Sequence, residues 1–495
     1  MYLLIKKNKR MKKFFGFFMA VLGLAMCAMT TSCSSDDNDD NGGKPEPAEM
    51  AKYTIMFYGC GGANVDSQLD FAIKEVQKQL GVANNQVRFV VMYSTSASDK
   101  AHRVDPNTPV RLHYGDWATT YRYELTTDIT EDNYNARCKY KAASEVELYR
   151  VETIKEFLTW AKQTAPAENY ILMPVNHGGG FDLDHEGLTR AIAYDDNHGG
   201  KGVATKAFAQ ALEETGTYLK AIYWYGCLMG QLEVMTEMAP YCDYQFASSH
   251  VALVNPRHVT AIIQAINENP DDFDKVAERQ GELLDAPGDY CFSQNFLNYE
   301  DDETHEVHDE NCDFACWRSD KLAAINAQVK KLATLLKNNY ADHKVDINAA
   351  IQATYIYDGE LAYADLVDLA VHVASDLEES DLAAEANQIV ADLKAAVKDA
   401  YIYRISGLHR KQMADGEVIN TIWPKKDYYS VGISIYTKNN KIYQDYQNVY
   451  KASAFDAATG WSAWLDVNEQ DVEMGVNPSN DNFWDVFWMT DDLEY

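Results

Sequence analysis

Proline and basic residues are scarce in this chain of 495 residues. It contains 12 Pro, and its 44 Lys and Arg are outnumbered by 75 Asp and Glu, which gives a formal net charge of −31. The low proline and ordinary glycine content exclude a collagen-like or low-complexity chain. Because no basic excess is available to neutralise phosphates, nucleic acid is not an expected partner. Length and composition indicate a globular protein of two or more domains.

Long apolar runs are also few, and the clearest one lies near the N-terminus. Residues 1–13 carry six cations and no acid, and the apolar run from Phe14 to Met29 is too short to span a membrane comfortably. This pattern indicates a secretory signal. The small residues before Cys33 resemble a bacterial lipoprotein signal, so we expect cleavage of residues 1–32 and lipidation of Cys33. An ordinary cleaved signal, in which Cys33 has no role, is the alternative.

The segment that follows Cys33 is polar and acidic. Residues 33–50 contain few apolar side chains, so they are expected to form a flexible tether. An acidic run directly after a lipidated cysteine resembles the surface-export signal of Bacteroides-type lipoproteins. We therefore predict a lipoprotein of the bacterial outer membrane that contacts the membrane through Cys33, with exposure at the cell surface as one option.

Cysteine is modest in number and gives no clear metal site. Nine are present, and the predicted processing assigns Cys27 to the signal and Cys33 to the lipid, which leaves an odd number. At least one thiol is then unpaired if no partner chain is involved. The spacing of Cys312 and Cys316, with His305 and His308 nearby, is too loose to predict zinc. We expect no bound metal there and leave disulfides or free thiols open.

The mature chain alternates between apolar strands and amphipathic helices. Such alternation predicts an α/β fold with a caspase-like, mostly parallel sheet flanked by helices. The expected strands are residues 53–58, 88–93, 170–176 and 219–225, and the expected helices are 65–80, 145–163, 205–215 and 228–239. We predict that residues 51–310 form this domain.

The composition changes from about residue 311, where long alanine- and leucine-rich helices begin. Residues 311–495 are therefore predicted to form a helix-rich α/β C-terminal domain. Its expected helices are residues 321–337, 363–378, 382–400 and 455–465, with one strand at 429–436.

Two residues with catalytic chemistry follow predicted strands. His177 ends one strand and Cys227 another, and the carboxyl ends of parallel strands share one edge of the sheet. A cysteine just before a helix N-terminus favours the thiolate, and a neighbouring histidine can accept the thiol proton. The amides of Gly178 and Cys227 are candidates for an oxyanion hole.

The alternatives for these residues are less specific. Cys227 alone could be a buried core cysteine, and His177 alone a hydrogen-bonded polar group. Gly178 to Gly180 also match the oxyanion loop of some esterases, but those enzymes need a G-x-S-x-G elbow, which this chain lacks.

Four blocks of the sequence resemble the clostripain family of cysteine peptidases, which share a caspase-like fold with gingipains, legumains and caspases. They are residues 53–69, 176–180, 191–196 and 226–233, and residues 432–436 and the region of Trp461 add to the similarity. The resemblance implies that His177 is the general base and Cys227 the nucleophile. It also implies that the amides of Gly178 and Cys227 stabilise the oxyanion, and that peptides or proteins are the substrates.

The sequence departs from this family at the expected substrate pocket. The family usually has Asp two residues before the cysteine, where this chain has Tyr225, and glutamates after the position of Ser248, where it has Ser249 and His250. Without these carboxylates, the pocket has no negative charge to bind an Arg or Lys side chain. The family resemblance therefore does not extend to a trypsin-like specificity. We predict a P1 preference other than Arg or Lys, with Tyr225, Ser248 and His250 in the pocket.

Two further properties of the family bear on this chain. Some members are activated by cleavage after a basic residue between the two catalytic blocks, and Arg190-Ala191 lies at a comparable place. A plain surface arginine is the alternative there. Some members need calcium, so calcium is the one cofactor that the resemblance leaves open.

Three functions fit these observations. The first is a lipid-anchored cysteine endopeptidase of the cell envelope that uses a Cys227–His177 dyad. The second is a catalytically inactive surface lipoprotein that binds ligands on the same scaffold, favoured by Tyr225, His250 and the 32 Tyr and 9 Trp of the chain. The third is an acyl or amide hydrolase of another substrate class that uses the same dyad.

Overall fold

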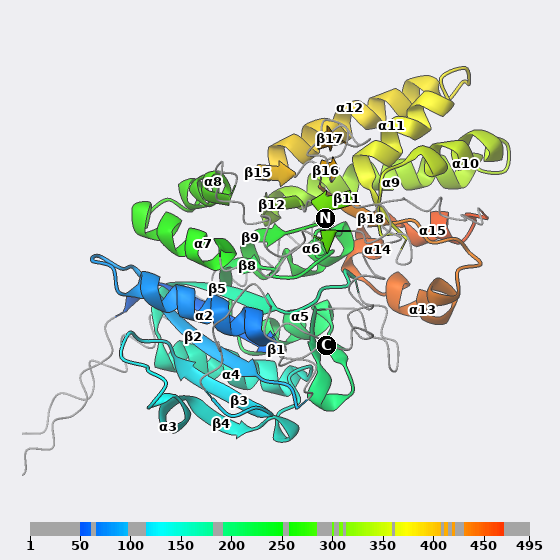
Figure 1. Cartoon of the computed structure of the whole chain (residues 1–495). Coiled ribbons are helices and arrows are strands. Elements are labelled where there is room, and N and C mark those ends of the chain that lie inside the picture. The colour runs from blue at the N-terminus through cyan, green and yellow to red at the C-terminus, as the bar shows by residue number, and fades with distance from the viewer. Residues whose placement is uncertain are drawn as a thin grey trace, which may run out of the picture. The chain divides into compact units, whose positions relative to one another are not determined.

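A nine-stranded sheet forms the centre of the fold (Figure 1). Its strand order is β15-β12-β9-β8-β5-β1-β2-β3-β4. The strands are β1 (Ala51–Cys60), β2 (Val87–Ser94), β3 (Thr119–Glu124), β4 (Lys139–Ala142), β5 (Ala167–Val175), β8 (Leu219–Tyr223), β9 (Cys242–Ala247), β12 (Asp313–Arg318) and β15 (Tyr401–Ser406). Within this sheet β9, β8, β5, β1 and β2 pair in parallel, and β3 and β12 run in the opposite direction. The predicted α/β class with a mostly parallel sheet is confirmed.

The structure is a computed structural model, and its described residues belong to one compact unit. It describes residues 50–60, 66–97, 115–181, 192–250, 257–284, 299–300, 306–309, 313–358, 362–406, 410–413, 418–420 and 430–469. The predicted signal, Cys33 and the Arg190-Ala191 bond lie outside the described residues, as do His305 and Cys312.

Both faces of the sheet are buried, as the continuous apolar strands predict. Along β1, Ile55 and Phe57 pack on one side, whereas Met56 and Tyr58 pack on the other. The first side is covered by α2 (Asp66–Leu80), α7 (Arg257–Glu268) and α8 (Phe273–Leu284). The second side is covered by α4 (Val151–Thr164), α5 (Thr205–Glu214) and α6 (Leu232–Met238). The middle of the sheet is therefore a rigid base for its carboxyl edge.

The C-terminal half adds a helical layer and a small sheet (Figure 1). The helices are α9 (Leu322–Asn339), α10 (Lys344–Ala353), α11 (Leu366–Asp376), α12 (Ala383–Ala400), α13 (Lys441–Lys451), α14 (Ala454–Thr459) and α15 (Ser462–Leu465). A three-stranded sheet contains β13 (Ile356–Asp358), β14 (Tyr363–Asp365) and β18 (Gly432–Ser434). The core of this half also takes in Trp317 from β12 and Leu232 and Met235 from α6.

The predicted division at residues 310 and 311 stays a prediction, to which the structure adds one fact. Strands β12 and β15 come from the second segment, yet they complete the sheet of the first.

Smaller elements are α3 (Tyr134–Cys138), the pair β6 (Ile192–Asp195) and β7 (Lys201–Val203), and a four-stranded sheet of β10 (Tyr299–Glu300), β11 (Glu306–Asp309), β16 (Arg410–Met413) and β17 (Val418–Asn420).

Four predicted helices have clearly different limits in the structure. The helix expected at 145–163 begins only at Val151. The helix expected at 363–378 begins only at Leu366, because Asp365 caps it by accepting hydrogen bonds from the amides of Val367 and Asp368. Residues 363–365 belong to β14 instead. The helix expected at 455–465 is divided by Gly460, whose φ of 67° ends α14. The helix expected at 228–239 begins only at Leu232.

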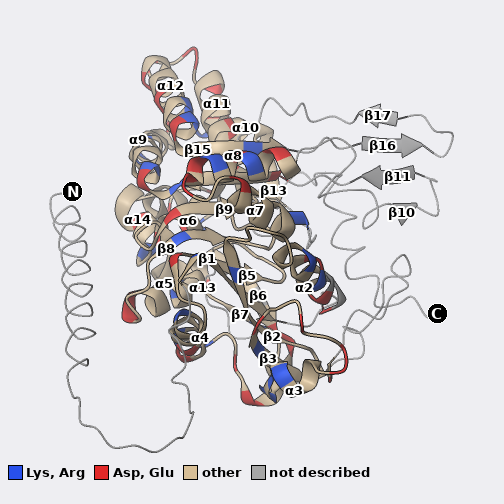
Figure 2. Cartoon of the chain, turned by 90° about the vertical axis from the view of Figure 1, so that its left-hand side faces the viewer, with Lys and Arg blue, Asp and Glu red and all other residues tan. Residues whose placement is uncertain are grey.

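Charged side chains are mixed over the surface. Figure 2 shows Lys and Arg interspersed with Asp and Glu along the helices of that side. Typical pairs are Arg88 with Glu124 and Arg279 with Glu268, at 2.6 and 2.7 Å. In the part of the chain that the structure describes, no helix is long and apolar enough to cross a bilayer.

Candidate active site

His177 follows β5 directly, at the carboxyl edge of the sheet. The preceding Asn176 is fully buried and has a φ of 150°, a conformation that is unfavourable for a residue other than glycine. Its side-chain amide donates to the carbonyl of Cys60 at 2.6 Å, and its side-chain oxygen accepts from the amide of His177. Asn176 therefore fixes the backbone from which the half-buried His177 projects.

Cys227 follows β8 at the same edge, beside the His177 segment. A bridge joins Val175 to Tyr225, and the amide of Asn176 donates to the carbonyl of Tyr225 at 3.4 Å. A Cβ atom on Gly178 would lie 2.1 Å from the carbonyl oxygen of Cys227 and 2.9 Å from its amide nitrogen. The two backbones thus approach so closely that only glycine fits at Gly178. The structure brings these two segments together as the sequence predicted; the roles of His177 and Cys227 stay predictions.

Cys227 differs from the other cysteines that the structure describes. Its exposed fraction is 8%, whereas Cys60, Cys138, Cys242 and Cys316 are at most 1% exposed. Burial raises the thiol pKa of each of these four, to about 12 for Cys138 and Cys242. These five cysteines are not joined to one another in disulfides. Among the described cysteines, Cys227 is therefore the one that a reagent from solvent reaches most readily.

The residues after Cys227 form a strained turn, which we call the 227–230 turn. Leu228 has a φ of 60°, in the left-handed region that favours glycine. Its amide donates to the carbonyl of His250 at 2.8 Å, and the amide of Gly230 donates to the carbonyl of Ser248 at 2.6 Å. Leu228, with its positive φ, and Gln231, which is extended, cannot belong to a right-handed helix, so α6 begins at Leu232. The expected helix N-terminus directly after Cys227 is wrong, because the turn separates the two.

Ser248 and His250 lie in the loop after β9 and are both buried. The Ser248 hydroxyl donates to Oδ1 of Asp313 at 2.6 Å, and the His250 amide donates to the same oxygen at 2.9 Å. The ring of His250 lies 6.4 Å from that of Tyr355 and 6.1 Å from that of Tyr357. The loop is therefore close to the 227–230 turn, and the predicted contact of Ser248 and His250 with substrate stays a prediction.

Asp313 is a functional candidate that the sequence reasoning missed. It is 1% exposed at the start of β12, and burial raises the pKa of its carboxyl group against the effect of its hydrogen bonds. In sequence it is one of many acids in an acidic stretch far from Cys227. Only its position at the start of an apolar strand, Phe314 to Trp317, could have marked it as buried.

Tyr225 is fully buried on the face of the sheet that carries α7. Its ring centre lies 5.3 Å from that of His258, and His258 Nδ1 lies 2.7 Å from the hydroxyl oxygen of Tyr223. Burial lowers the pKa of His258 to about 3, so this imidazole is neutral near pH 7. The place where the family carries an acid is therefore filled here by an aromatic ring against a neutral histidine; a role of Tyr225 in substrate binding stays a prediction.

The C-terminal half contacts the site at two places that the sequence did not reveal. The hydroxyl of Tyr363, in β14, donates toward the carbonyl oxygens of Gly179 and Phe181 at 3.2 and 3.1 Å. A Cβ on Gly180 would lie 2.7 Å from the Tyr363 ring, so this ring packs directly on the glycine loop after His177. The 227–230 turn is also linked to β18, since the amide of Gly432 donates to the carbonyl of Gly230 at 3.1 Å.

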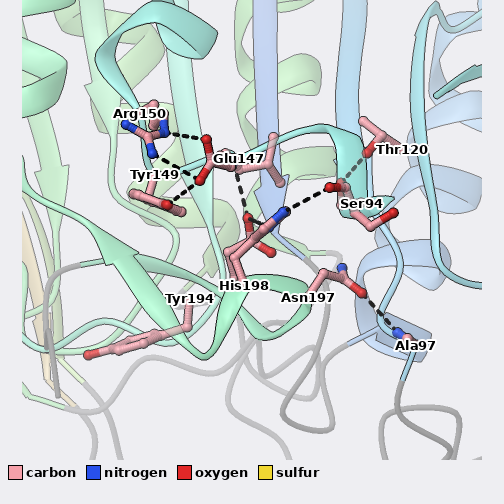
Figure 3. A network of polar contacts seen from close by, with 12 residues as sticks. Ser94, Ala97, Thr120, Glu147, Tyr149, Arg150, Tyr194, Asn197 and His198 are labelled. Carbon is pink, nitrogen blue, oxygen red and sulfur yellow. Dashed lines mark hydrogen bonds and ion pairs between the residues drawn. The ribbon is translucent and has the colours of Figure 1, made fainter. Parts of the chain in front are cut away.

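The segment after the predicted processing bond is anchored by a network of polar contacts (Figure 3). A bridge joins Ile192 in β6 to Gly178. Asp195 accepts from the amide of Leu148 at 3.1 Å and lies 2.8 Å from Nδ1 of His198. Asn197 donates to the carbonyl of Thr95 at 3.1 Å and accepts from the amide of Ala97 at 3.0 Å.

The residue types at this edge are those that acyl transfer through a thiol uses. A cysteine, a histidine and backbone amides of a glycine loop follow neighbouring strands, and the backbones of Gly178 and Cys227 are in contact. Among the described residues, no group of three His, Cys, Asp or Glu is placed to hold a metal ion.

Comparisons with known proteins agree with this arrangement. The model of the clostripain family matches residues 66–467. Clostripain from Hathewaya histolytica is 23% identical over 300 residues, which are 59% of this chain and 52% of that protein. The chain therefore matches about half the length of this relative.

Two solved structures share the fold. One is a secreted C11 cysteine protease from Bacteroides thetaiotaomicron in complex with an irreversible peptide inhibitor; its TM-score is 0.54 at 15% identity, over 83% of this chain and 99% of that one. The other is an inactive zymogen C11 protease from Parabacteroides distasonis, with a TM-score of 0.53 at 13% identity, over 83% of this chain and 99% of that one.

Proposed function

Because the chain belongs to the clostripain family, we propose that it is a cysteine endopeptidase in which Cys227 is the nucleophile and His177 the general base. The observation that carries this proposal is the contact between the Gly178 and Cys227 backbones at the carboxyl edge of the sheet. That contact supports a common reaction centre for the two side chains. The similarity to clostripain and to the C11 proteases supports peptides as substrates.

The reaction would proceed in two steps. His177 takes the thiol proton of Cys227, and the sulfur attacks the carbonyl carbon of the peptide while the amides of Gly178 and Cys227 stabilise the negative oxygen. The C–N bond then breaks, and His177 returns the proton to the leaving amine. Water hydrolyses the thioester, which releases the acid and restores the thiol.

We further propose a P1 preference other than Arg or Lys. At Tyr225 the buried ring offers no negative charge, and the neighbouring His258 is neutral. Asp313 is buried, and its Oδ1 accepts hydrogen bonds from Ser248 and His250. Among the predicted pocket residues Tyr225, Ser248 and His250, none supplies a carboxylate that would stabilise a basic P1 side chain.

Lipidation at Cys33 and attachment to the outer membrane are part of the same proposal and rest on the sequence of residues 1–50. Fractionation of cells that express a Cys33→Ala variant tests the lipid anchor. The variant should move from the membrane to the soluble fraction, and an unchanged distribution would contradict lipidation at Cys33.

Processing at Arg190-Ala191 is supported by the anchoring of β6, since the hydrogen bonds of Asp195 and Asn197 would retain the segment after cleavage.

A peptide library tests the proposed activity. Residues 34–495, as wild type and as Cys227→Ala, are incubated with diverse peptides with and without calcium, and the products are identified by mass spectrometry. Cleavage by the wild type alone is expected, with uncharged residues before the cut. A matched Cys60→Ala variant should retain cleavage, because Cys60 is buried beneath the edge. No cleavage by folded wild-type protein would favour the inactive binding scaffold instead.

A further inference from the structure

We propose that Asp313 is a positioning residue that maintains the 227–230 turn, and with it the amide and thiol of Cys227, in the reactive arrangement. The role in catalysis rests on the proposed function, whereas the role in the turn can be measured independently. Asp313 lies on β12, far from Cys227 in sequence, and is joined to the turn through the loop after β9.

Two consecutive layers of hydrogen bonds connect Asp313 to the turn. In the first layer, Oδ1 of Asp313 accepts from the Ser248 hydroxyl at 2.6 Å and from the His250 amide at 2.9 Å. In the second layer, the carbonyls of these same two residues accept from the amides of Gly230 and Leu228, at 2.6 and 2.8 Å. One buried carboxylate thus orients both carbonyls that bind the turn.

The turn needs such support because its conformation is intrinsically unfavourable. Leu228 has a φ of 60°, in the left-handed region that a residue other than glycine adopts only at an energetic cost. A strained conformation persists only where surrounding contacts over-determine it. If the carbonyl of His250 shifts, Leu228 loses its amide partner and can relax, and the adjacent Cys227 amide and sulfur change position.

The burial of Asp313 makes its contribution strong. The side chain is 1% exposed, and buried donors that lose their acceptor remain unsatisfied at a high cost. Asp313 lies two residues before Ala315, which pairs antiparallel with Ala247 of β9, so the strand fixes the carboxyl group relative to the loop that follows β9. Solvent does not replace this support, because Ser248 and His250 are buried as well.

The test compares Asp313→Ala and Asp313→Asn with a matched control. Asparagine retains an Oδ1 acceptor of the same shape, so it should preserve part of the effect even if the alanine variant folds poorly. The control is Asp456→Ala in α14, because Asp456 also accepts from a backbone amide and a hydroxyl, both of Ser462, at 2.7 and 2.9 Å. Thermal unfolding of all variants reports how far each change destabilises the whole protein.

Two readouts separate positioning from plain stability. Hydrogen exchange of the Leu228 and Gly230 amides should become at least about ten-fold faster in Asp313→Ala, with a smaller change in Asp313→Asn and none in Asp456→Ala. For peptide cleavage, kcat should fall by about 10- to 100-fold in Asp313→Ala while KM stays within about two-fold. The kcat of Asp313→Asn should be higher than that of Asp313→Ala, because asparagine retains the Oδ1 acceptor.

Two results would overturn the proposal. One is unchanged exchange of the Leu228 and Gly230 amides in folded Asp313 variants. The other is a loss of kcat in Asp456→Ala equal to that in Asp313→Ala. If the wild type cleaves no peptide, the proposed function fails, but the exchange measurement still decides whether Asp313 maintains the turn. If Asp313→Ala does not fold, the exchange and kcat of Asp313→Asn decide alone.

Discussion

At the scale of single residues, the candidate site depends on conformations that sequence patterns do not show. Asn176 and Leu228 both have positive φ values, and each is adjacent to one of the two predicted reactive residues. Nothing in the local sequence marks either residue, because neither is glycine. The strain is a consequence of hydrogen bonds from distant segments, so it is visible only in the folded chain.

His258 permits a prediction of pH dependence. Its folded pKa is lowered to about 3 by burial, whereas in the unfolded chain it is about 6.5. Below pH 6.5 the unfolded chain binds a proton that the folded protein excludes, so this residue lowers stability by about 1.4 kcal/mol for each further pH unit. That loss continues toward pH 3, and above pH 6.5 His258 causes none.

The comparison is between wild type and His258→Gln in urea unfolding at several pH values between 7.5 and 4. The free-energy advantage of the wild type should shrink as the pH falls below 6.5, because only the wild type carries the buried imidazole. A difference that stays constant over this range would mean that His258 titrates normally in the folded protein.

At the scale of elements, the strands were the easier part to predict. The continuous apolar runs at β1, β2, β5 and β8 can form only strands buried on both faces, so their sequence determines them strongly. The sequence predicts a helix directly after Cys227 because its pattern is amphipathic from Leu228 onward. The positive φ of Leu228 excludes it from a right-handed helix, and that conformation is fixed by tertiary hydrogen bonds to the 248–250 loop.

The contact between β14 and the glycine loop after His177 also gives a prediction. Tyr363→Phe removes the hydroxyl that faces Gly179 and Phe181, and it should lower stability by about 1 kcal/mol. Because that loop carries Gly178, peptide cleavage should decrease several-fold as well. Chemical unfolding and kcat measure the two effects.

Tyr443→Phe is the matched control for Tyr363→Phe. Tyr443 is buried and its hydroxyl donates to the Ser462 carbonyl at 3.3 Å and to Asp466 at 3.0 Å, within the C-terminal half. The Tyr443→Phe variant should lower the free energy of unfolding by about as much as Tyr363→Phe does, and it should leave kcat unchanged. Equal kcat values for wild type and Tyr363→Phe would show that β14 does not position the loop.

At the scale of the whole molecule, helix α6 joins the two segments of the chain, because its side chains pack into the core of each. Glu233 in α6 is fully buried and accepts from the amide of Ser434 at 3.0 Å and the hydroxyl of Tyr450 at 2.7 Å. It thus joins the helix after the 227–230 turn to β18 and α13. Contacts across such distances leave no local pattern in the sequence, and the predicted division at residues 310 and 311 stays a prediction.

Glu233→Ala should therefore destabilise the whole described unit. Loss of the acceptor leaves a buried amide and a buried hydroxyl unsatisfied, at a cost of about 2–4 kcal/mol. Glu237, one turn later, is half-buried and accepts from the amide of Ala454 at 2.9 Å in a solvent-exposed hydrogen bond, so Glu237→Ala should cost less than about 1 kcal/mol. A single unfolding transition that shifts in Glu233→Ala supports a shared core, whereas two separate transitions would contradict it.

The central claim is that Cys227, activated by His177, attacks peptide carbonyl groups. The most direct measurement is covalent labelling with a peptide that ends in an electrophilic ketone, followed by mass mapping of every cysteine. We expect one adduct, on Cys227. It should form much more slowly in the His177→Ala variant and at the wild-type rate in the Cys60→Ala variant. An adduct on another cysteine, or no adduct on folded wild-type protein, would contradict the account.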